Sequence, residues 1–172
     1  MALKENRGGL CVEDKLKAAV ALRNAGKAEE AKMMLFELYE QNAGDAELLY
    51  QLAWTHDVLG LERAAVPFYE KSLALGLPSE QRVGALLGLG STYRTLGEYE
   101  KSKGLLMQAV QEYPENKEFP AFLAMTLHNL GEHSQAMELL LKLLAETSAD
   151  EGIRSYSKAI SYYSDKLEQV WD

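Results

Sequence analysis

Four glycines recur along this chain at a nearly constant spacing, and this regularity constrains the fold more than any other feature. Gly26, Gly60, Gly97 and Gly131 are separated by 34, 37 and 34 residues. A glycine at the end of a helix favours a left-handed cap, because no Cβ opposes a positive φ there. The spacing therefore predicts tight turns, each joining two helices of a repeated unit.

Superposed on these glycines, the chain divides into units at residues 12–45, 46–79, 83–116 and 117–150, with residues 80–82 inserted. Small residues recur seven positions before each glycine and five positions after it. They are Ala19, Ala53, Gly90 and Ala124 before the glycines, and Ala31, Ala65, Ser102 and Ala136 after them. Small side chains let helices approach closely, so each unit is predicted to form an antiparallel helix pair.

The array resembles the tetratricopeptide repeat family, in particular its small bacterial cytosolic members. The third unit carries the signature best, with Leu89, Gly90, Tyr93, Ser102, Leu106 and Pro114 at the expected positions. No unit has the signature tryptophan, and Pro120 stands in its place in the fourth. The resemblance covers residues 12–150. It implies an all-α, right-handed superhelical solenoid of four helix-turn-helix repeats with a C-terminal capping helix, in one domain over residues 1–172.

We expect helices over residues 13–24, 28–41, 46–59, 62–75, 80–96, 99–112, 118–130 and 133–146, and a last one over 151–170. The last carries an apolar stripe formed by Ile153, Tyr156, Ile160, Tyr163, Leu167 and Val170. A terminal repeat needs a cap with a polar outer face. The stripe therefore either caps the array or packs on a second copy of the chain. Residues 1–11 have no comparable helix, so the first repeat is expected to be poorly capped.

Gly84, Gly88 and Gly90 lie in one predicted helix, although each costs about 0.5–1 kcal/mol relative to alanine. Two interpretations remain open. The glycines either permit close packing or form a flexible joint between the second and third units.

Charge and composition exclude several classes of partner. The net charge is −8, and no basic stripe is present, so neither nucleic acid nor a membrane surface is expected as a partner. No apolar run approaches the roughly 20 residues of a membrane-spanning helix. The single cysteine, Cys11, excludes an internal disulfide and favours a reducing, cytoplasmic location.

The sequence contains no set of residues typical of an active site. It has no nucleotide-binding loop, no nucleophile elbow and no zinc-protease motif, so we expect a protein that is not an enzyme and has no cofactor. His56 stands at the signature tyrosine position and is expected in the core. His128 and His133 flank the fourth glycine turn, but they lack a nearby third ligand, so we expect no metal site.

The resemblance implies that the first helix of each pair lines a concave groove that binds a partner. The matching residues are Lys17, Arg23, Asn24, Tyr50, Gln51, Trp54, Asp57, Ser91, Arg94, Phe122, Met125 and His128. Tyr50 and Trp54 are four residues apart and share one helical face. Exposed aromatic residues near arginine are typical of binding hot spots, although Trp54 and Phe122 could instead fill the core.

Family members that clamp a peptide's terminal carboxylate use lysine and asparagine at fixed groove positions. Those positions hold Leu16, Val20, Gln51, Gly84 and Gly88 here, so that clamp is absent. We therefore expect a non-catalytic interaction module that binds a peptide or an amphipathic helix of another protein. The alternative is a self-associating structural subunit, a homodimer formed through the groove or the C-terminal helix.

Overall fold

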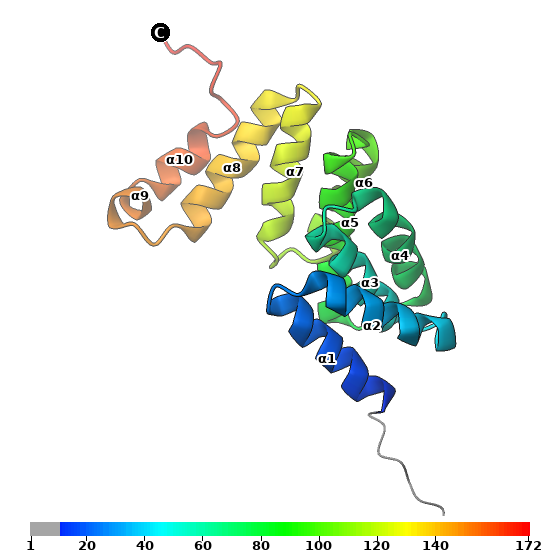
Figure 1. The fold of residues 1–172 in the computed structure, drawn as a ribbon. Coiled ribbons are helices and arrows are strands. Elements are labelled where there is room, and N and C mark those ends of the chain that lie inside the picture. The colour runs from blue at the N-terminus through cyan, green and yellow to red at the C-terminus, as the bar shows by residue number, and fades with distance from the viewer. Residues whose placement is uncertain (1–10) are drawn as a thin grey trace, which may run out of the picture. The chain divides into compact units, whose positions relative to one another are not determined.

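The computed structural model describes residues 11–172, and all regular structure in that range is α-helical (Figure 1). Eight helices match their predicted ranges to within one residue at each end. They are α1 (Val12–Asn24), α2 (Ala28–Gln41), α3 (Ala46–Val58), α4 (Glu62–Leu75), α5 (Ser79–Thr95), α6 (Tyr99–Glu112), α7 (Glu118–Asn129) and α8 (His133–Thr147). The expectation for the N-terminal segment falls almost wholly on residues 1–10, which lie outside the described range.

The helices form two compact units, of which the first ends at Leu77 and the second begins at Pro78. In the first unit, α1 packs on α2, α2 on α3, and α3 on α4. Its core contains Leu16, Leu35, Leu48 and Leu52. In the second unit, α5 packs on α6, α7 packs on both of them, and α8 packs on α7. Each unit therefore repeats one arrangement, in which a helix pair receives the first helix of the next pair.

The four repeated glycines form the same turn. Their φ angles lie between 70° and 80°. The residue after each glycine donates its backbone N–H to the carbonyl five residues earlier, as Lys27 does to Leu22 and Glu132 to Leu127, both at 2.9 Å. This bond pattern is the Schellman cap, which satisfies the last carbonyls of a helix. The predicted tight turns are confirmed.

Close packing explains one of the unusual glycines. Gly90 on α5 lies against Leu106 on α6, and a Cβ at Gly90 would lie 2.7 Å from Leu106 Cδ2. The Ser102 hydroxyl donates to the Gly90 carbonyl at 2.7 Å. A larger residue would force the buried Leu106 side chain to move, so the close-packing interpretation is confirmed at Gly90.

The predicted single helix over 151–170 is wrong. The structure has two short helices, α9 (Glu151–Ser155) and α10 (Ser157–Tyr163), with no helix after Tyr163. The Ser155 hydroxyl donates to the Gly152 carbonyl at 2.7 Å, and the Tyr156 N–H bonds to Ile153, three residues back. The carbonyl that a continuing helix would use is thus taken by a side chain, and serine and glycine both favour such breaks.

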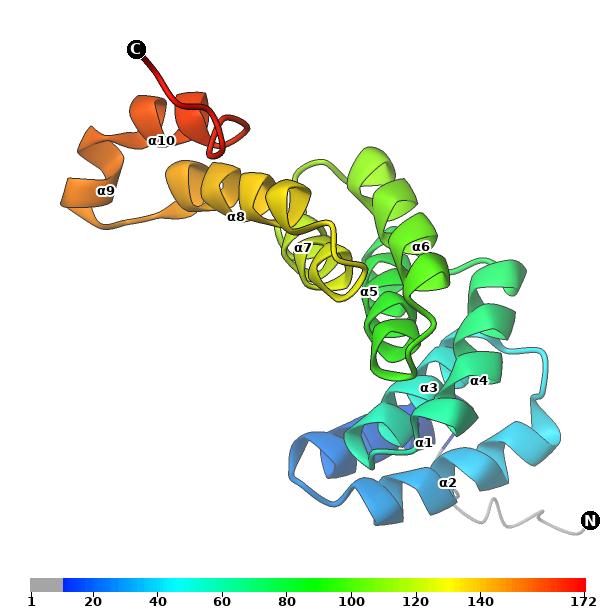
Figure 2. The same ribbon diagram turned by 90° about the horizontal axis from the view of Figure 1, so that it is seen from above.

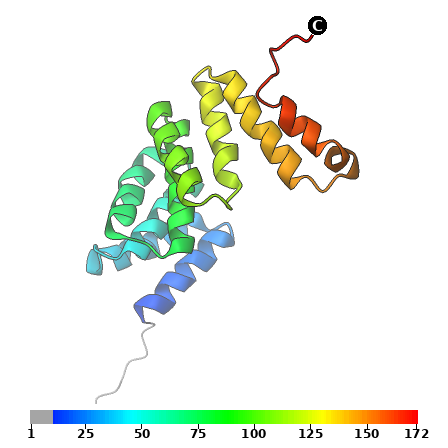
Figure 3. The same cartoon turned by 180° about the vertical axis from the view of Figure 1, so that it is seen from behind.

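The C-terminal segment covers only one side of the last repeat. Helix α8 lies between α7 and α10 (Figures 1 and 3), and α10 runs along α8 when viewed from above (Figure 2). Both α9 and α10 contact α8, but within residues 11–172 neither contacts α7. One face of the α7–α8 pair is therefore left without a covering helix. None of the helices described between residues 11 and 172 is long and apolar enough to cross a membrane.

Candidate partner-binding surfaces

The first candidate surface lies in the first unit and is centred on Trp54; we call it the Trp54 surface. The guanidinium carbon of Arg23 lies 3.8 Å from the centre of the Trp54 ring. Arg23 Nη1 also donates to Gln51 Oε1 at 2.7 Å. The Tyr50 ring lies 5.9 Å from that of Trp54. Trp54 is 41% exposed, whereas Arg23, Tyr50 and Gln51 are buried, so three buried side chains support one exposed ring.

The electrostatics of this surface follow from burial. Burial lowers the pKa of Arg23, and the nearby Tyr50 and Tyr69 partly oppose that shift. Arginine nevertheless remains charged at neutral pH, so the Trp54 ring face is held by a cation–π interaction. Beside it, the Tyr69 hydroxyl donates to Asp57 Oδ2 at 2.8 Å. Burial, together with the charge and hydrogen bond of Asp57, raises the pKa of Tyr69 far above its ordinary value.

The structure answers the question that the sequence left open for Trp54, because its ring is exposed on the surface and does not fill the core. Lys17 and Asn24 are also exposed, and Lys17 pairs with Glu13 at 2.6 Å. Asp57 is half-buried. The assignment of these residues to a partner-binding groove stays a prediction.

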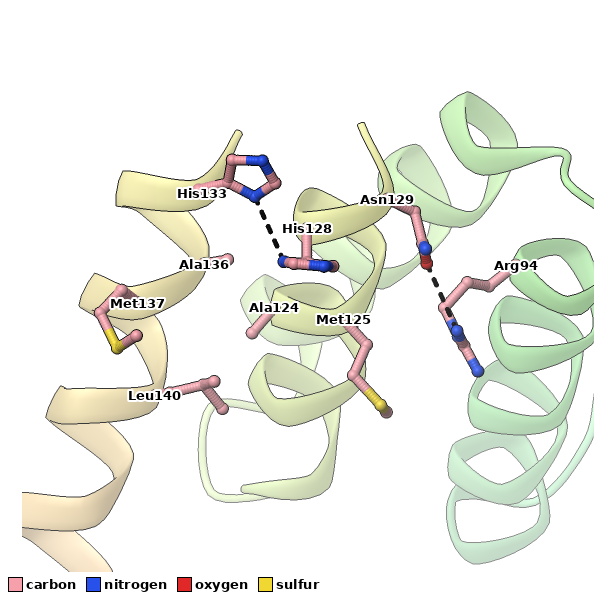
Figure 4. Close-up of a pocket in the computed structure, with 9 residues that line it drawn as sticks. All are labelled: Arg94, Ala124, Met125, His128, Asn129, His133, Ala136, Met137 and Leu140. Atoms are coloured by element: carbon pink, nitrogen blue, oxygen red, sulfur yellow. Dashed lines mark hydrogen bonds between the residues drawn. The ribbon is translucent and has the colours of Figure 1, made fainter. Parts of the chain in front are cut away.

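The second candidate surface is a cavity of about 530 Å³ in the second unit, which we call the α7–α8 hollow (Figure 4). Helix α7 contributes Ala124, Met125, His128 and Asn129 to its lining. Helix α8 contributes His133, Ala136, Met137 and Leu140, and α5 contributes Arg94. The volume lies within the range of about 300–1,000 Å³ typical of ligand sites, and methionines suit an adaptable apolar surface.

His128, His133 and Asn129 lie near the turn between α7 and α8, whereas Arg94 comes from α5 and reaches Asn129 (Figure 4). His133 Nδ1 lies 3.2 Å from His128 Nδ1, a hydrogen bond that requires one ring to donate and the other to accept. Arg94 Nη1 donates to Asn129 Oδ1 at 3.3 Å. None of the nine lining residues carries a carboxylate, although the chain is acidic as a whole. The hollow therefore combines an apolar floor with one end rich in nitrogen donors.

Three predicted groove residues, Arg94, Met125 and His128, meet in this hollow. Ser91 and Phe122 are half-buried and do not line it. Met137 and Leu140 were not among the predicted groove residues, since that prediction considered only the first helix of each pair. The sequence signal that could have found them is that polar Ser157, Lys158 and Ser161 stand at the positions of Leu123, Ala124 and Leu127.

The remaining histidine lies in the core, as predicted. His56 is buried, and its Nδ1 lies 2.7 Å from the Leu52 carbonyl, to which it donates. Within the described residues, no group of three or more histidine, cysteine, aspartate or glutamate side chains could hold a metal ion.

A family model matches most of this architecture. The model described as "Tetratrico peptide repeat" matches residues 46–167, more than half of the chain. The chain belongs to the tetratricopeptide repeat family. The helix pairs, the phased small residues and the glycine turns are thus those of this family. A comparison with curated proteins found no match.

Solved tetratricopeptide repeat structures share the fold of this repeat protein at low sequence identity. A fragment of MamA from Desulfovibrio magneticus RS-1, from residue 41 to its end, aligns with a TM-score of 0.66 and 19% identity, covering 94% of this chain and 97% of the fragment. Repeats of a putative kinesin light chain from Podospora anserina give 0.70 and 19%, covering 92% and 88%. YrrB, described as having an unusual peptide-binding site, gives 0.67 and 18%, covering 88% and 77%. Proteins of this fold are generally non-catalytic scaffolds, and the fold supports protein–protein interaction.

Proposed function

We propose that this protein is a non-catalytic cytoplasmic module, a single tetratricopeptide domain that binds a peptide or helix of another protein with Trp54 as its anchor. The observation that carries the proposal is the support of an exposed tryptophan by three buried side chains. Tryptophan and arginine are the residues most enriched at binding hot spots. A ring already held in place loses little conformational entropy on binding, which favours affinity.

Two further observations support this function. Trp54 lies on the first helix of its pair, where family members are expected to present their partner-binding residues. One structural neighbour is described as having a peptide-binding site of its own. The missing carboxylate clamp favours recognition through apolar side chains over recognition of a chain terminus.

The test is affinity capture from the cytosol of the source organism with three purified forms of the protein. Trp54→Ala should lose at least about 90% of a partner captured by the wild type, since truncating an anchor costs about 2 kcal/mol or more. The matched control is Trp171→Ala, which removes the other tryptophan, also exposed and outside the Trp54 surface. Equal capture by Trp54→Ala and the wild type would refute the anchor.

A second candidate role is self-association as a homodimer. It is supported by the exposed apolar side chains of Leu167, Val170 and Trp171 in the C-terminal segment. Sedimentation equilibrium distinguishes the two roles, because a dimer has twice the monomer mass of 19.2 kDa. A monomer at all concentrations would exclude the structural role.

A further inference from the structure

In the second unit, the packing of α7 shows how a helix pair binds the first helix of the next pair. Helix α7 packs on both α5 and α6. Its Thr126 hydroxyl lies 2.9 Å from the Ser102 hydroxyl, and Asn129 accepts from Arg94. Leu106 on α6, in the middle of this contact region, is completely buried. An amphipathic helix is therefore the element that fits this face of a helix pair.

The same face recurs on α7–α8 and is exposed. Leu140 lies 34 residues after Leu106 and occupies the equivalent position, yet it is 43% exposed. Met137, equivalent to Lys103, is 45% exposed, and Leu144 on the same helix is also exposed. His128 stands at the position of Arg94. The α7–α8 hollow is thus the counterpart of the site that α7 fills one repeat earlier.

The chain's own C-terminal segment does not fill this site, since within the described residues α9 and α10 contact α8 and not α7. The buried positions of α7 are Phe119, Leu123, Ala124, Thr126 and Leu127. The residues 34 positions later are Ile153, Ser157, Lys158, Ile160 and Ser161, so three of the five positions are polar. The segment instead packs along the other side of α8, where Ser134 donates to Glu168.

We propose that the α7–α8 hollow is a second binding site, which accepts one amphipathic helix from a partner protein as if it were the first helix of a further repeat. The partner helix presents apolar residues to Met125, Met137 and Leu140. It carries a carboxylate near its C-terminal end, at the position where α7 carries Asn129.

Charge complementarity supports the carboxylate. The donor-rich end of the hollow holds Arg94, His128 and His133, and no lining residue is acidic. Asn129 on α7 accepts from Arg94, and His128 stands at the Arg94 position of the next repeat. A carboxylate at the Asn129 position of the incoming helix would therefore accept a charge-assisted hydrogen bond from His128.

The test uses the full chain and two fluorescein-labelled synthetic peptides with the sequence of residues 117–131. One peptide carries the Asn129→Glu change and the other Asn129→Lys. Fluorescence anisotropy should show saturable binding of the glutamate peptide, with at least about fivefold weaker binding of the lysine peptide. His128→Leu in the protein should reduce this discrimination, because it removes the donor at the position equivalent to Arg94.

Matched protein variants locate the site. Leu140→Lys should weaken binding of the glutamate peptide at least about tenfold, the change that corresponds to 1.4 kcal/mol. Met107→Lys on α6 is the control, since Met107 is 44% exposed, lies outside the hollow and should leave binding within about twofold. Leu140→Gln provides a second variant at an exposed position, and circular dichroism checks that each variant is folded.

Three results would overturn the proposal. They are absence of saturable binding up to about 1 mM peptide, equal binding to Leu140→Lys and wild type, and a dimer of the chain alone that Leu140→Lys dissociates. The last would assign the hollow to a second copy. The Trp54→Ala variant should bind the peptide normally, so this site and the Trp54 surface can succeed or fail independently.

Discussion

Arg23 lies over the Trp54 ring, 3.8 Å from its centre, while the same guanidinium donates to Gln51. One buried cation thus links α1 to α3 through two contacts of different kinds. The aromatic contact fixes the orientation of an exposed ring, and the hydrogen bond satisfies an amide that has little access to water.

Replacement of Arg23 should loosen Trp54. Arg23→Ala is expected to cost about 1–3 kcal/mol, because it leaves buried Gln51 without its donor, and to increase acrylamide quenching of Trp54 fluorescence. The measurement uses a Trp171→Phe background, in which Trp54 is the single tryptophan. Lys17→Ala, at an exposed position on the same helix, should change neither quantity. Unchanged quenching in Arg23→Ala would show that Tyr50 alone positions the ring.

Tyr69 should make the free energy of unfolding depend on pH in the alkaline range. Its folded-state pKa is raised, by burial first and Asp57 second, whereas in the unfolded chain it titrates near 10. Above pH 10, unfolding therefore releases a proton, and the free energy of unfolding falls by about 1.4 kcal/mol per pH unit from this residue. Below pH 10 this contribution is fully present.

Tyr69→Phe removes that dependence. The variant should be less stable by about 1.5 kcal/mol at pH 7, where the hydrogen bond to Asp57 is lost. The deficit should shrink as the pH rises from 10 to 11. Urea unfolding of both proteins at several pH values measures the two curves, and parallel curves would contradict the shift in Tyr69.

Gly90 and Gly104 should respond to alanine in opposite directions. A Cβ at Gly90 would lie 2.7 Å from Leu106, so Gly90→Ala should destabilise by about 1–3 kcal/mol through overpacking. A Cβ at Gly104 on α6 meets nothing within 4 Å, so Gly104→Ala should stabilise by about 0.5–1 kcal/mol. Thermal unfolding of the pair measures both effects. Stabilisation by Gly90→Ala would mean that the Leu106 side chain repacks easily.

The ion pair between Arg82 and Glu112 should add modestly to the free energy of unfolding, and only at pH values where Glu112 is ionised. Arg82 donates from Nε and Nη2 to the two carboxylate oxygens, at 2.8 and 3.1 Å. This bonding lowers the pKa of Glu112 below its ordinary value of 4.5. The contribution is therefore present above about pH 4.5 and is lost as the pH falls through the folded-state pKa.

Because the pair is close to solvent, Glu112→Gln should cost less than about 1 kcal/mol at pH 7. The difference from the wild type should vanish near pH 2, and it should also decrease in about 1 M salt. Urea unfolding at the two pH values checks the prediction. A difference that persists at pH 2 would point to packing of the Glu112 side chain and not to its charge.

The repeat could be predicted from the sequence because its signals are local and recur in phase. A glycine turn and two small residues mark each helix pair, and their repetition gave eight helix ranges to within one residue. Leu106 and Leu140 show the limit of this reasoning. They occupy the same repeat position, but one is buried and the other exposed, because exposure depends on whether a further helix follows.

The candidate surfaces were only partly predictable for a related reason. The sequence was enough to assign Trp54 to one face of a helix. It did not predict that Arg23 is buried, because this depends on a contact with Gln51 on α3, which lies 28 residues away in the sequence. The prediction of a single last helix was wrong because it relied on an apolar stripe that is continuous in sequence. In the structure, the Ser155 hydroxyl donates to the Gly152 carbonyl, which a continuing helix would need as an acceptor. A stripe predicts which face is apolar. It does not predict whether the backbone bonds continue.

The uncovered face of α7–α8 has a consequence for gene architecture and for protein engineering. Duplication of the segment encoding residues 117–150 and its insertion after residue 150 would provide a helix with Leu, Ala and Leu at the three positions where the chain now has Ser157, Lys158 and Ser161. The array can therefore be lengthened in frame by whole repeats, and the present C-terminal segment would follow each new end unchanged.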